Sequence, residues 1–301
     1  MSLRLGTRGS ALALAQSRLV AERLERLAGE KVELVEIVTS GDRSSKPVHQ
    51  LGVGVFVSAL RDALATKEID FAVHSFKDLP TAPADGLVIA AIPPREDPRD
   101  ALIARDGLTL TELPEGATVG TGSLRRLAQL AALGLPLQGV PIRGNVDTRL
   151  RKVSQGEFDA VIVARAGLVR LDRAEEVTEI LDPMLMLPAP AQGALAVESR
   201  EDLVELLAPL DDRATRAAVT AERALLATLE AGCSAPVAAL AEVTDDDEIY
   251  LRGAVISPDG RYSLRLSRTG TLAEADRVGR LLAADLLAEG ADRVIESIGR
   301  A

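Results

Sequence analysis

The chain has a single cysteine, Cys233, which follows a glycine in residues 229–236, Leu-Glu-Ala-Gly-Cys-Ser-Ala-Pro. One thiol cannot form an internal disulfide, so it is either a small buried apolar group or a reactive group. The preceding glycine permits a tight turn that leaves the sulfur reachable. This arrangement suits a point of covalent attachment, and burial is the plain alternative.

Two arginine-rich motifs follow predicted strands. Residues 120–126 read Gly-Thr-Gly-Ser-Leu-Arg-Arg, and residues 142–150 read Ile-Arg-Gly-Asn-Val-Asp-Thr-Arg-Leu. Free amides at a helix start favour anions, and arginine adds bidentate pairing with carboxylate or phosphate. Arg8, after the first predicted strand, makes a third such position. Three equivalent strand ends with arginine indicate an anion site, although any one of them alone is a typical solvated arginine.

The remaining chemistry is sparse. Asp78 lies in a loop with apolar neighbours, so it is suited to proton transfer if partly desolvated, or else to an ion pair with Lys77. Of the two histidines, His49 is expected to be solvated and His74, at a strand end, to be structural. No metal-ligand spacing, Walker A motif or dinucleotide fingerprint is present, so no metal is expected.

Composition narrows the classes of partner. The 301 residues carry a net charge of −10, from 45 acidic and 35 basic side chains, and aromatic residues make up 2%. This argues against nucleic acid, whose phosphates the overall field repels and whose bases need stacking partners. No apolar run reaches membrane-span length, and the start lacks an apolar signal region. We therefore expect a cytoplasmic protein without a membrane partner.

The element pattern predicts an α/β fold. Strands are expected at residues 3–5, 32–38 and 71–74, and helices at 11–27, with Ser10 as N-cap, and at 55–65. A second series has strands near 101–104, 118–120, 137–142 and 160–164, and helices near 123–133 and 146–155. Such alternation implies mostly parallel sheets with helices on both faces and ligands at the carboxyl ends of strands.

Two segments are expected to cross between domains, the charged residues 95–100 and the proline-rich residues 187–193. A helix at 212–229 then leads to Cys233, followed by strands at 237–243, 249–257 and 262–267 and a helix at 273–289. The predicted domains are residues 1–93 with 194–211, residues 99–187, and residues 213–301.

Six segments together closely resemble the porphobilinogen deaminase (hydroxymethylbilane synthase) family over essentially the whole chain. They are residues 6–10 (Gly-Thr-Arg-Gly-Ser), 74–80 (His-Ser-Phe-Lys-Asp-Leu-Pro), 95–100 (Arg-Glu-Asp-Pro-Arg-Asp), 120–126, 143–150 and 229–233. The resemblance implies two doubly wound domains like those of periplasmic binding proteins plus a small C-terminal α+β domain. It also implies a monomer.

The resemblance implies a transferase of tetrapyrrole and heme biosynthesis. It would condense four porphobilinogen molecules head to tail, with loss of ammonia, and release hydroxymethylbilane. A dipyrromethane cofactor would be held by a thioether to Cys233. A six-ring chain carries about twelve carboxylates, which demand planar bidentate partners. Loss of ammonia leaves a cationic azafulvene, which an aspartate can stabilise.

The matched positions imply these roles. Asp78 is the catalytic residue. The cofactor-binding set is Cys233, Lys77, Thr121, Ser123, Arg125, Arg126 and Arg149. The substrate-binding set is Arg8, Ser10, Phe56, Arg143 and Arg170.

The chain departs from the family pattern at four positions. Val53 replaces a loop lysine, Gly122 a serine and Ala191 a glycine, and Arg165 occupies a position that is often small or apolar. Two other readings stay open. A non-catalytic two-lobed anion-binding protein would share the fold and the arginines. A thiol-nucleophile enzyme would need a histidine near Cys233, and neither histidine is close in sequence.

Overall fold

The structure is a computed structural model that describes residues 2–38, 57–229 and 235–298. By its contacts the chain divides into two units, Met1–Glu96 with Gly193–Arg216 and Asp97–Gln192 with Ala217–Ala301. Two of the three division points, after Glu96 and after Gln192, fall inside the segments expected to cross, and the third, after Arg216, falls inside the expected helix at 212–229. The expected third domain, residues 213–301, has its own sheet but shares the second unit with residues 97–192. The three domain boundaries therefore stay a prediction.

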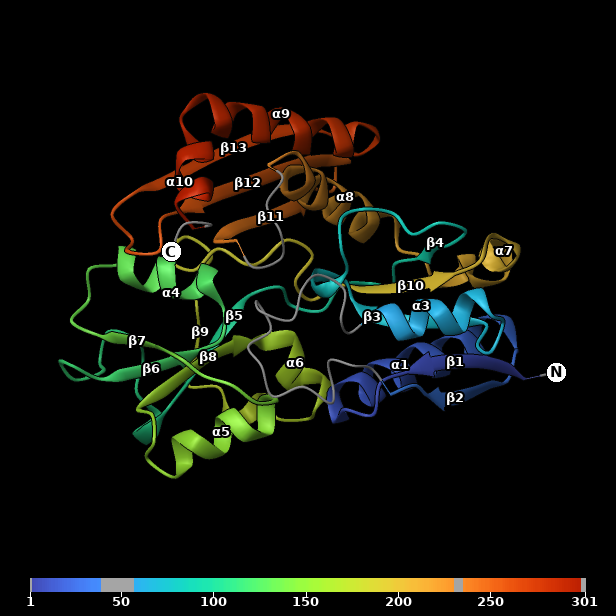
Figure 1. Cartoon of the computed structure of the whole chain (residues 1–301), viewed down its shortest axis with the longest axis horizontal. Helices are drawn as coiled ribbons and strands as arrows, with labels where there is room; N and C mark the ends of the chain where they lie inside the picture. Colours follow the sequence, from blue (N-terminus) through green and yellow to red (C-terminus); the bar gives the residue numbers. More distant parts are fainter. Residues whose placement is uncertain (1, 39–56, 230–234, 299–301) are drawn as a thin grey trace. The chain divides into compact units, whose positions relative to one another are not determined.

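The first unit is built on a five-stranded sheet (Figure 1). In sheet order its strands are β2 (Val32–Glu36), β1 (Leu3–Thr7), β3 (Phe71–Ser75), β10 (Leu195–Ser199) and β4 (Val88–Ala91). Strands β2, β1 and β3 are parallel, whereas β10 runs antiparallel to both of its neighbours. The sheet is thus mixed, and its carboxyl edge brings together the chain after β1 and the chain after β3.

Helices cover both faces of this sheet. Helices α1 (Ala11–Ala28) and α7 (Val204–Leu207) pack with the core around Phe71, and α3 (Ser58–Ala65) packs on the opposite face around Ala72. The expected N-cap is confirmed, since the Ser10 hydroxyl accepts a hydrogen bond from the Ala13 amide at 3.3 Å. The helix ends at Gly29, whose φ of 72° suits a left-handed C-cap.

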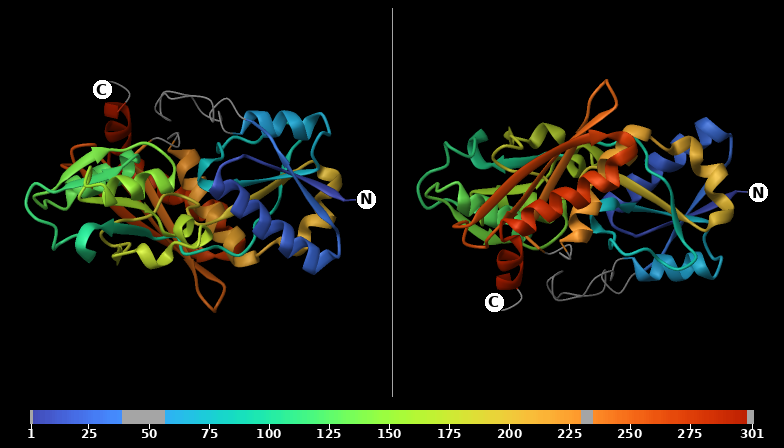
Figure 2. Two further views of the ribbon diagram at one scale, coloured as in Figure 1. Left: turned by 90° about the horizontal axis from the view of Figure 1, so that it is seen from below. Right: turned by 90° about the horizontal axis from the view of Figure 1, so that it is seen from above.

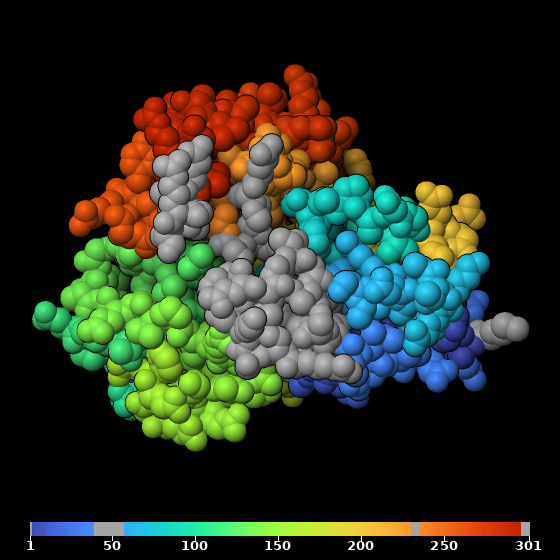
Figure 3. Space-filling view, viewed as in Figure 1, coloured from blue at the N-terminus to red at the C-terminus, as the bar shows by residue number. Residues whose placement is uncertain are grey.

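The second unit repeats the strand order. Its five-stranded sheet runs β7 (Gln138–Pro141), β6 (Thr118–Thr121), β8 (Ala160–Ala164), β5 (Asp100–Ala104) and β9 (Glu179–Ile180). Strands β7, β6 and β8 are parallel, and β5 is antiparallel to β8 and β9. Alternate residues of β5 enter different cores: Leu102 packs on the face of α4 (Leu124–Ala132), and Ala101 on the face of α5 (Val146–Ser154) and α6 (Arg165–Arg170). Helix α5 forms part of the surface coloured yellow-green in Figure 3.

A separate three-stranded antiparallel sheet follows, with strands β11 (Val237–Val243), β12 (Glu248–Ile256) and β13 (Ser263–Thr271). Helices α8 (Arg213–Thr228), α9 (Ala275–Ala288) and α10 (Ala291–Ile298) share one core with this sheet. Figure 2 shows α9 lying along the strands. Alanine and leucine side chains of the other face pack against Ala128 of α4 and Leu187. The small α+β domain is therefore packed onto the helix that carries Arg125 and Arg126.

The predicted fold class, α/β with two sheet-and-helix domains and a small C-terminal α+β domain, is confirmed in outline. Strands β4, β9 and β10 and helices α6, α7 and α10 were not predicted individually. The expectation of mostly parallel sheets is confirmed, since four of the five strands in each sheet run in one direction and only β10 and β5 run antiparallel to their neighbours. Among the described residues no helix is long and apolar enough to cross a membrane.

Candidate anion-binding site

The carboxyl edge of the second sheet collects the arginine motifs. Strands β6, β7 and β8 end at this edge, and antiparallel β5 begins there. The motifs at residues 120–126 and 142–150 and the segment 97–100 therefore meet, although residues 101–141 separate the first of the three segments from the last. The topology brings together two of the three arginine-bearing strand ends of the sequence analysis, whereas Arg8 follows β1 of the other sheet.

The turn between β6 and α4 leaves helix amides open. Ser123 is the N-cap residue of α4, but its side chain makes no capping hydrogen bond. Its amide donates instead to the buried Thr121 hydroxyl at 3.4 Å, which shapes the turn. First-turn amides without a side-chain acceptor attract anions, and the helix dipole adds to this. Thr121 and Ser123 thus lie at the helix start where the motif of residues 120–126 predicts an anion site.

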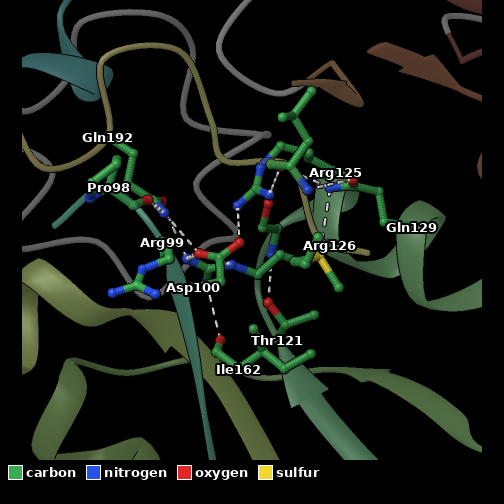
Figure 4. Close-up of polar contacts among 12 residues, drawn as sticks. Pro98, Arg99, Asp100, Thr121, Arg125, Arg126, Gln129, Ile162 and Gln192 are labelled. Atoms are coloured by element: carbon green, nitrogen blue, oxygen red, sulfur yellow. Dashed lines mark hydrogen bonds and ion pairs between the residues drawn. The ribbon is translucent and has the colours of Figure 1, made fainter. Parts of the chain in front are cut away.

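Arg125 and Arg126 point inward from the first turn of α4 and are 3% and 5% exposed. Both pair with Asp100, which is fully buried at the start of β5: Arg125 Nη2 lies 2.7 Å from Oδ2 and Arg126 Nη2 2.8 Å from Oδ1 (Figure 4). Arg125 also donates to the Leu187 carbonyl, and Arg126 Nη1 donates to the Ile162 carbonyl at 3.0 Å. The sequence expected direct carboxylate binders here, and the structure shows most of these donors already engaged within the protein.

One donor of the pair remains. The Arg125 Nε atom is buried without a hydrogen-bond partner. Burial raises the pKa of Asp100, but the two guanidinium groups and the Gln192 amide outweigh it and bring that pKa down to about 2. The carboxylate is therefore charged at neutral pH and shared between two cations, leaving the group with a net positive charge.

Asp97 repeats this pattern at the same edge. It lies 2.6 Å from Arg99 Nη2 and 2.6 Å from Arg165 Nη1. Burial acts to raise the pKa of Asp97, but pairing with Arg99 and Arg165 lowers it below the ordinary value. Two aspartates thus face four arginines, so positive charge exceeds negative charge along the edge. Arg165, which departs from the family pattern, is held by its ion pair with Asp97.

Arg149 is the most exceptional cation of the site. Its Nε donates to the Gly144 carbonyl at 2.9 Å, and within the described part of the chain no carboxylate pairs with it. Burial, with a smaller contribution from the charge of Arg126, lowers the pKa of Arg149 to about 10. A Cβ at Gly122 would lie 3.0 Å from the Ile142 carbonyl and 3.4 Å from Arg149 Nη2. A side chain at position 122 would therefore crowd the Ile142 carbonyl and this guanidinium, and the glycine allows the two to lie close to the turn.

Arg143 and Arg170 are placed differently. Arg143 is exposed in the loop before α5, whose N-cap Asn145 accepts a hydrogen bond from the Thr148 amide at 2.9 Å. Arg170 is the last residue of α6, at the end of the helix away from the β8 strand end. Arg143 lies at the same edge as Arg149, whereas Arg170 lies beyond it.

The first unit gathers the other expected residues at its own carboxyl edge. Arg8 and Ser10 follow β1, and Lys77 and Asp78 belong to the short 3₁₀ helix η2 (Phe76–Asp78) after β3. Asp78 is exposed, so the partial desolvation considered from its apolar neighbours is not observed, and it makes no ion pair with Lys77. The alternative structural role for Asp78 therefore has no support here. The Ser10 hydroxyl is already used as a helix cap.

The histidine expected to be structural is buried on β3. His74 Nε2 lies 3.1 Å from Glu198 Oε2 without an aligned hydrogen bond, and Arg61 Nη2 donates to Glu198 Oε1 at 2.9 Å. Burial raises the pKa of Glu198, but contacts with His74 and Arg61 lower it below its ordinary value. These contacts tie β3 to β10 and agree with a structural role.

Cys233 and Phe56 lie outside the described residues, as does His49. Among residues 2–38, 57–229 and 235–298, no group of histidine, cysteine and acidic side chains could hold a metal ion. Sequence reasoning missed the role of Asp100 and that of Gln192. The available signal was a lone acidic residue directly before the apolar run Ala-Leu-Ile-Ala.

Fold and site together define an α/β protein with an unneutralised arginine cluster for anionic ligands at a sheet edge. The family description "Porphobilinogen deaminase, dipyromethane cofactor binding domain" matches residues 3–208, and "Porphobilinogen deaminase, C-terminal domain" matches residues 216–288. The chain belongs to the porphobilinogen deaminase family.

Similar proteins extend over nearly the whole chain. A porphobilinogen deaminase of Nocardia farcinica is 60% identical, covering 98% of this chain and 88% of the relative. One of Mycobacterium tuberculosis H37Rv is 57% identical, covering 96% and 97%. Among solved structures, the methionine binding protein MetQ covers 69% of this chain and 88% of its own at 14% identity, with a TM-score of 0.43. Because this TM-score is low, the similarity carries no weight for the fold, which is assigned from the strand order of the two five-stranded sheets.

The residues at this edge fit a cofactor rich in carboxylates. The buried Arg125 Nε lacks a partner, Arg149 is a half-buried cation without a carboxylate partner among the described residues, and Gly122 has no side chain to crowd it. A buried donor without a partner and a cation without a counter-charge each raise the free energy of the protein alone. A bound anion would lower that free energy by pairing with them. The family's dipyrromethane cofactor is such a group, so the expectation of this cofactor is confirmed at the level of the family.

Proposed function

We propose that this enzyme condenses four porphobilinogen molecules head to tail onto a dipyrromethane bound through Cys233, releasing ammonia at each addition and finally hydroxymethylbilane. The family match over residues 3–208 and 216–288 supports the reaction class. The observation that carries the assignment to this site is Arg149, a half-buried guanidinium held by the Gly144 carbonyl and without a carboxylate partner in the described chain. Nothing in the structure favours a non-catalytic binder or a thiol-nucleophile enzyme.

The cofactor-binding set is proposed as Lys77, Thr121, Ser123, Arg125, Arg126 and Arg149, with Cys233 as the covalent link. When bound, the cofactor supplies the primer to which the growing chain stays attached. The β6–α4 turn offers helix amides, and Arg149 offers its two Nη groups beside Gly122. Arg125 and Arg126 act mainly through their excess charge, because Asp100 and backbone carbonyls occupy most of their donors.

The substrate-binding set is proposed as Arg8, Ser10, Phe56, Arg143 and Arg170. Arg143 is exposed at the same edge as Arg149 and can pair with substrate carboxylates. Ser10 contributes a hydroxyl that can donate while its oxygen caps α1. Phe56 lies outside the described residues and enters the proposal from its motif alone.

Asp78 is proposed as the catalytic residue. Each addition breaks the bond between the aminomethyl carbon and nitrogen of porphobilinogen, forms a carbon–carbon bond, and removes a proton from a pyrrole carbon. Positive charge develops on the substrate as ammonia leaves, and a carboxylate near the pyrrole N–H stabilises it. Asp78 is exposed and unpaired among the described residues, so its charge is available for this role.

The test is direct. Purified protein should carry a two-pyrrole adduct in its intact mass and should consume porphobilinogen with release of ammonia and hydroxymethylbilane. A protein with an unmodified mass and no consumption of porphobilinogen, although folded, would refute the proposal. Size-exclusion chromatography with light scattering tests the expected monomer, and cell fractionation tests the expected cytoplasmic location.

A further inference from the structure

The side chain of Gln192 joins the two crossing segments of the chain. It is 1% exposed, and its Nε2 donates to the Pro98 carbonyl at 2.7 Å and to Asp100 Oδ1 at 2.8 Å. Its Oε1 accepts a hydrogen bond from Arg126 Nη2 at 3.4 Å. Figure 4 shows these groups converging from the two segments and from α4. The amide of Gln192 therefore bonds to the first crossing segment, at Pro98 and Asp100, and also to Arg126 of the anion site.

The position of Gln192 makes this contact consequential. The chain passes from one unit to the other between Glu96 and Asp97 and again between Gln192 and Gly193. The residue before it, Ala191, has a φ of 60° and donates its amide to the buried Glu222 carboxylate at 2.6 Å. The residue after it, Gly193, has a φ of 87°. Gln192 thus lies between Ala191, whose amide is fixed by Glu222, and the turn at Gly193. The position of its side chain therefore depends on the backbone of the crossing segment.

Arg126 depends on the same atoms. Its Nε and Nη2 bind Asp100 Oδ1 at 3.1 and 2.8 Å, the oxygen that also accepts from Gln192. Asp100 lies two residues after Pro98 on the other crossing segment. A shift in either segment therefore changes the partners of Arg126.

We propose that Gln192 is a positioning residue that couples the placement of Arg126, and through it the binding of ligand carboxylates, to the path of the two crossing segments. This inference rests on the proposed function. As the pyrrole chain grows, successive carboxylates must meet the same arginines. A link from the crossing segments to Arg126 lets the arginine end of α4 respond to each addition.

Gln192→Leu removes every polar contact of this side chain, and Gln192→Met does the same without branching. Gln129→Leu is the matched control. Gln129 is also fully buried on α4 and bonds Leu187 through both amide atoms, at 2.9 and 2.8 Å. Its side chain makes no hydrogen bond to Arg125 or Arg126, although it shares the Leu187 carbonyl with Arg125. All three variants should lose stability, because each leaves buried polar groups unpaired.

The holoenzymes are compared by melting temperature, by KM and kcat for porphobilinogen, and by native mass spectra of enzyme-bound intermediates. Both Gln192 variants should raise KM about tenfold, because Asp100 and Arg126 each lose a hydrogen bond to this side chain, and should shift the intermediates. Gln129→Leu should do neither. Wild-type KM and intermediates in either Gln192 variant, or equal shifts in Gln129→Leu, would overturn the inference. A wild-type enzyme that does not consume porphobilinogen would instead refute the proposed function.

Discussion

Asp100 Oδ1 lies 2.8 Å from Arg126 Nη2 in a place where the aspartate is fully buried and the arginine 5% exposed. The same carboxylate binds Arg125 through its other oxygen. Removing one partner of a buried ion pair costs more than the pair itself contributes, because a charge is left without compensation. Asp100 is therefore essential to the architecture of the site without being a ligand-binding group.

Acid should weaken the protein through Asp100. Its pKa is about 2 in the folded protein and 3.8 ordinarily, so the unfolded chain binds the proton more readily. The stabilisation, about 2 kcal/mol, is fully present above about pH 4 and is lost as the pH falls through 2. Urea unfolding from pH 2 to 5 measures it. Asp100→Asn should flatten this part of the profile and destabilise at neutral pH by roughly 3–5 kcal/mol.

Asp159→Asn is the control for that measurement. Asp159 pairs with Arg105 and accepts from the Thr118 amide at the amino edge of the same sheet. The Asp159→Asn variant should lower the free energy of unfolding without changing cofactor loading. If Asp100→Asn leaves both the acid profile and neutral stability unchanged, the ion-pair interpretation is wrong.

Arg149→Met should separate stability from function. Arg149 has a folded pKa of about 10 against 12.5, so its charge is penalised in the folded protein at all pH values below 10 and the penalty fades as the pH rises above that. Removing the charge should raise the melting temperature of the apoprotein. Cofactor assembly, followed by intact mass, should slow about tenfold or more.

Arg151→Met on the exposed side of α5 is the matched control and should change neither quantity. Arg143→Met, in the substrate-binding set, should load the cofactor but accumulate partial chains. Identical loading and intermediates for the three variants would remove the division between cofactor-binding and substrate-binding arginines.

Asp78→Asn should slow the chemical step strongly while sparing the fold. The side chain is exposed and makes no ion pair with Lys77, so its loss leaves no buried group unpaired. Loss of a positioned acid–base and charge-stabilising group should reduce kcat by about 10²–10⁴-fold. Asp78→Glu should retain more activity than Asn. Single-turnover ammonia release alongside melting temperature decides: an early-melting Asn variant with normal turnover would exclude Asp78 from the mechanism.

Cys233→Ala should fold but lack the two-pyrrole adduct and the ability to hold product chains. A small-for-small change removes little apolar volume. Peptide mapping of active wild-type protein should place the adduct on Cys233. Unmodified Cys233 in fully active enzyme, or normal turnover of the alanine variant, would contradict covalent attachment there.

Ala191→Gly should stabilise the protein. Ala191 is fully buried at a φ of 60°, a conformation that costs a non-glycine residue about 1 kcal/mol. The gain, offset by the greater freedom of glycine in the unfolded chain, should be a few tenths to about 1 kcal/mol by urea unfolding. Gly193→Ala, at a φ of 87°, should lower stability instead. A loss in the first variant would show that the methyl group of Ala191 packs favourably enough to outweigh the backbone strain.

Much of the chain could be predicted from local pattern. Ser10, with its hydroxyl before a run of helix formers, predicted the start of α1, and the short apolar run at residues 160–164 predicted β8. The glycine and arginine motifs predicted which strand ends carry the anion site. These features depend on residues close in sequence, and so does the family resemblance.

Tertiary structure decided the partners. Strand β10 escaped prediction because its pairing residues on β3 lie about 120 positions earlier, as with Leu195 and Ser75. Arg125 and Arg126 looked like free ligand binders until the antiparallel course of β5 brought Asp100 between them. Whether a charged side chain meets a ligand or an internal partner depends on which distant carboxylates the fold places beside it. Only the folded chain could show that Arg149, and not its two neighbours on α4, keeps an uncompensated charge.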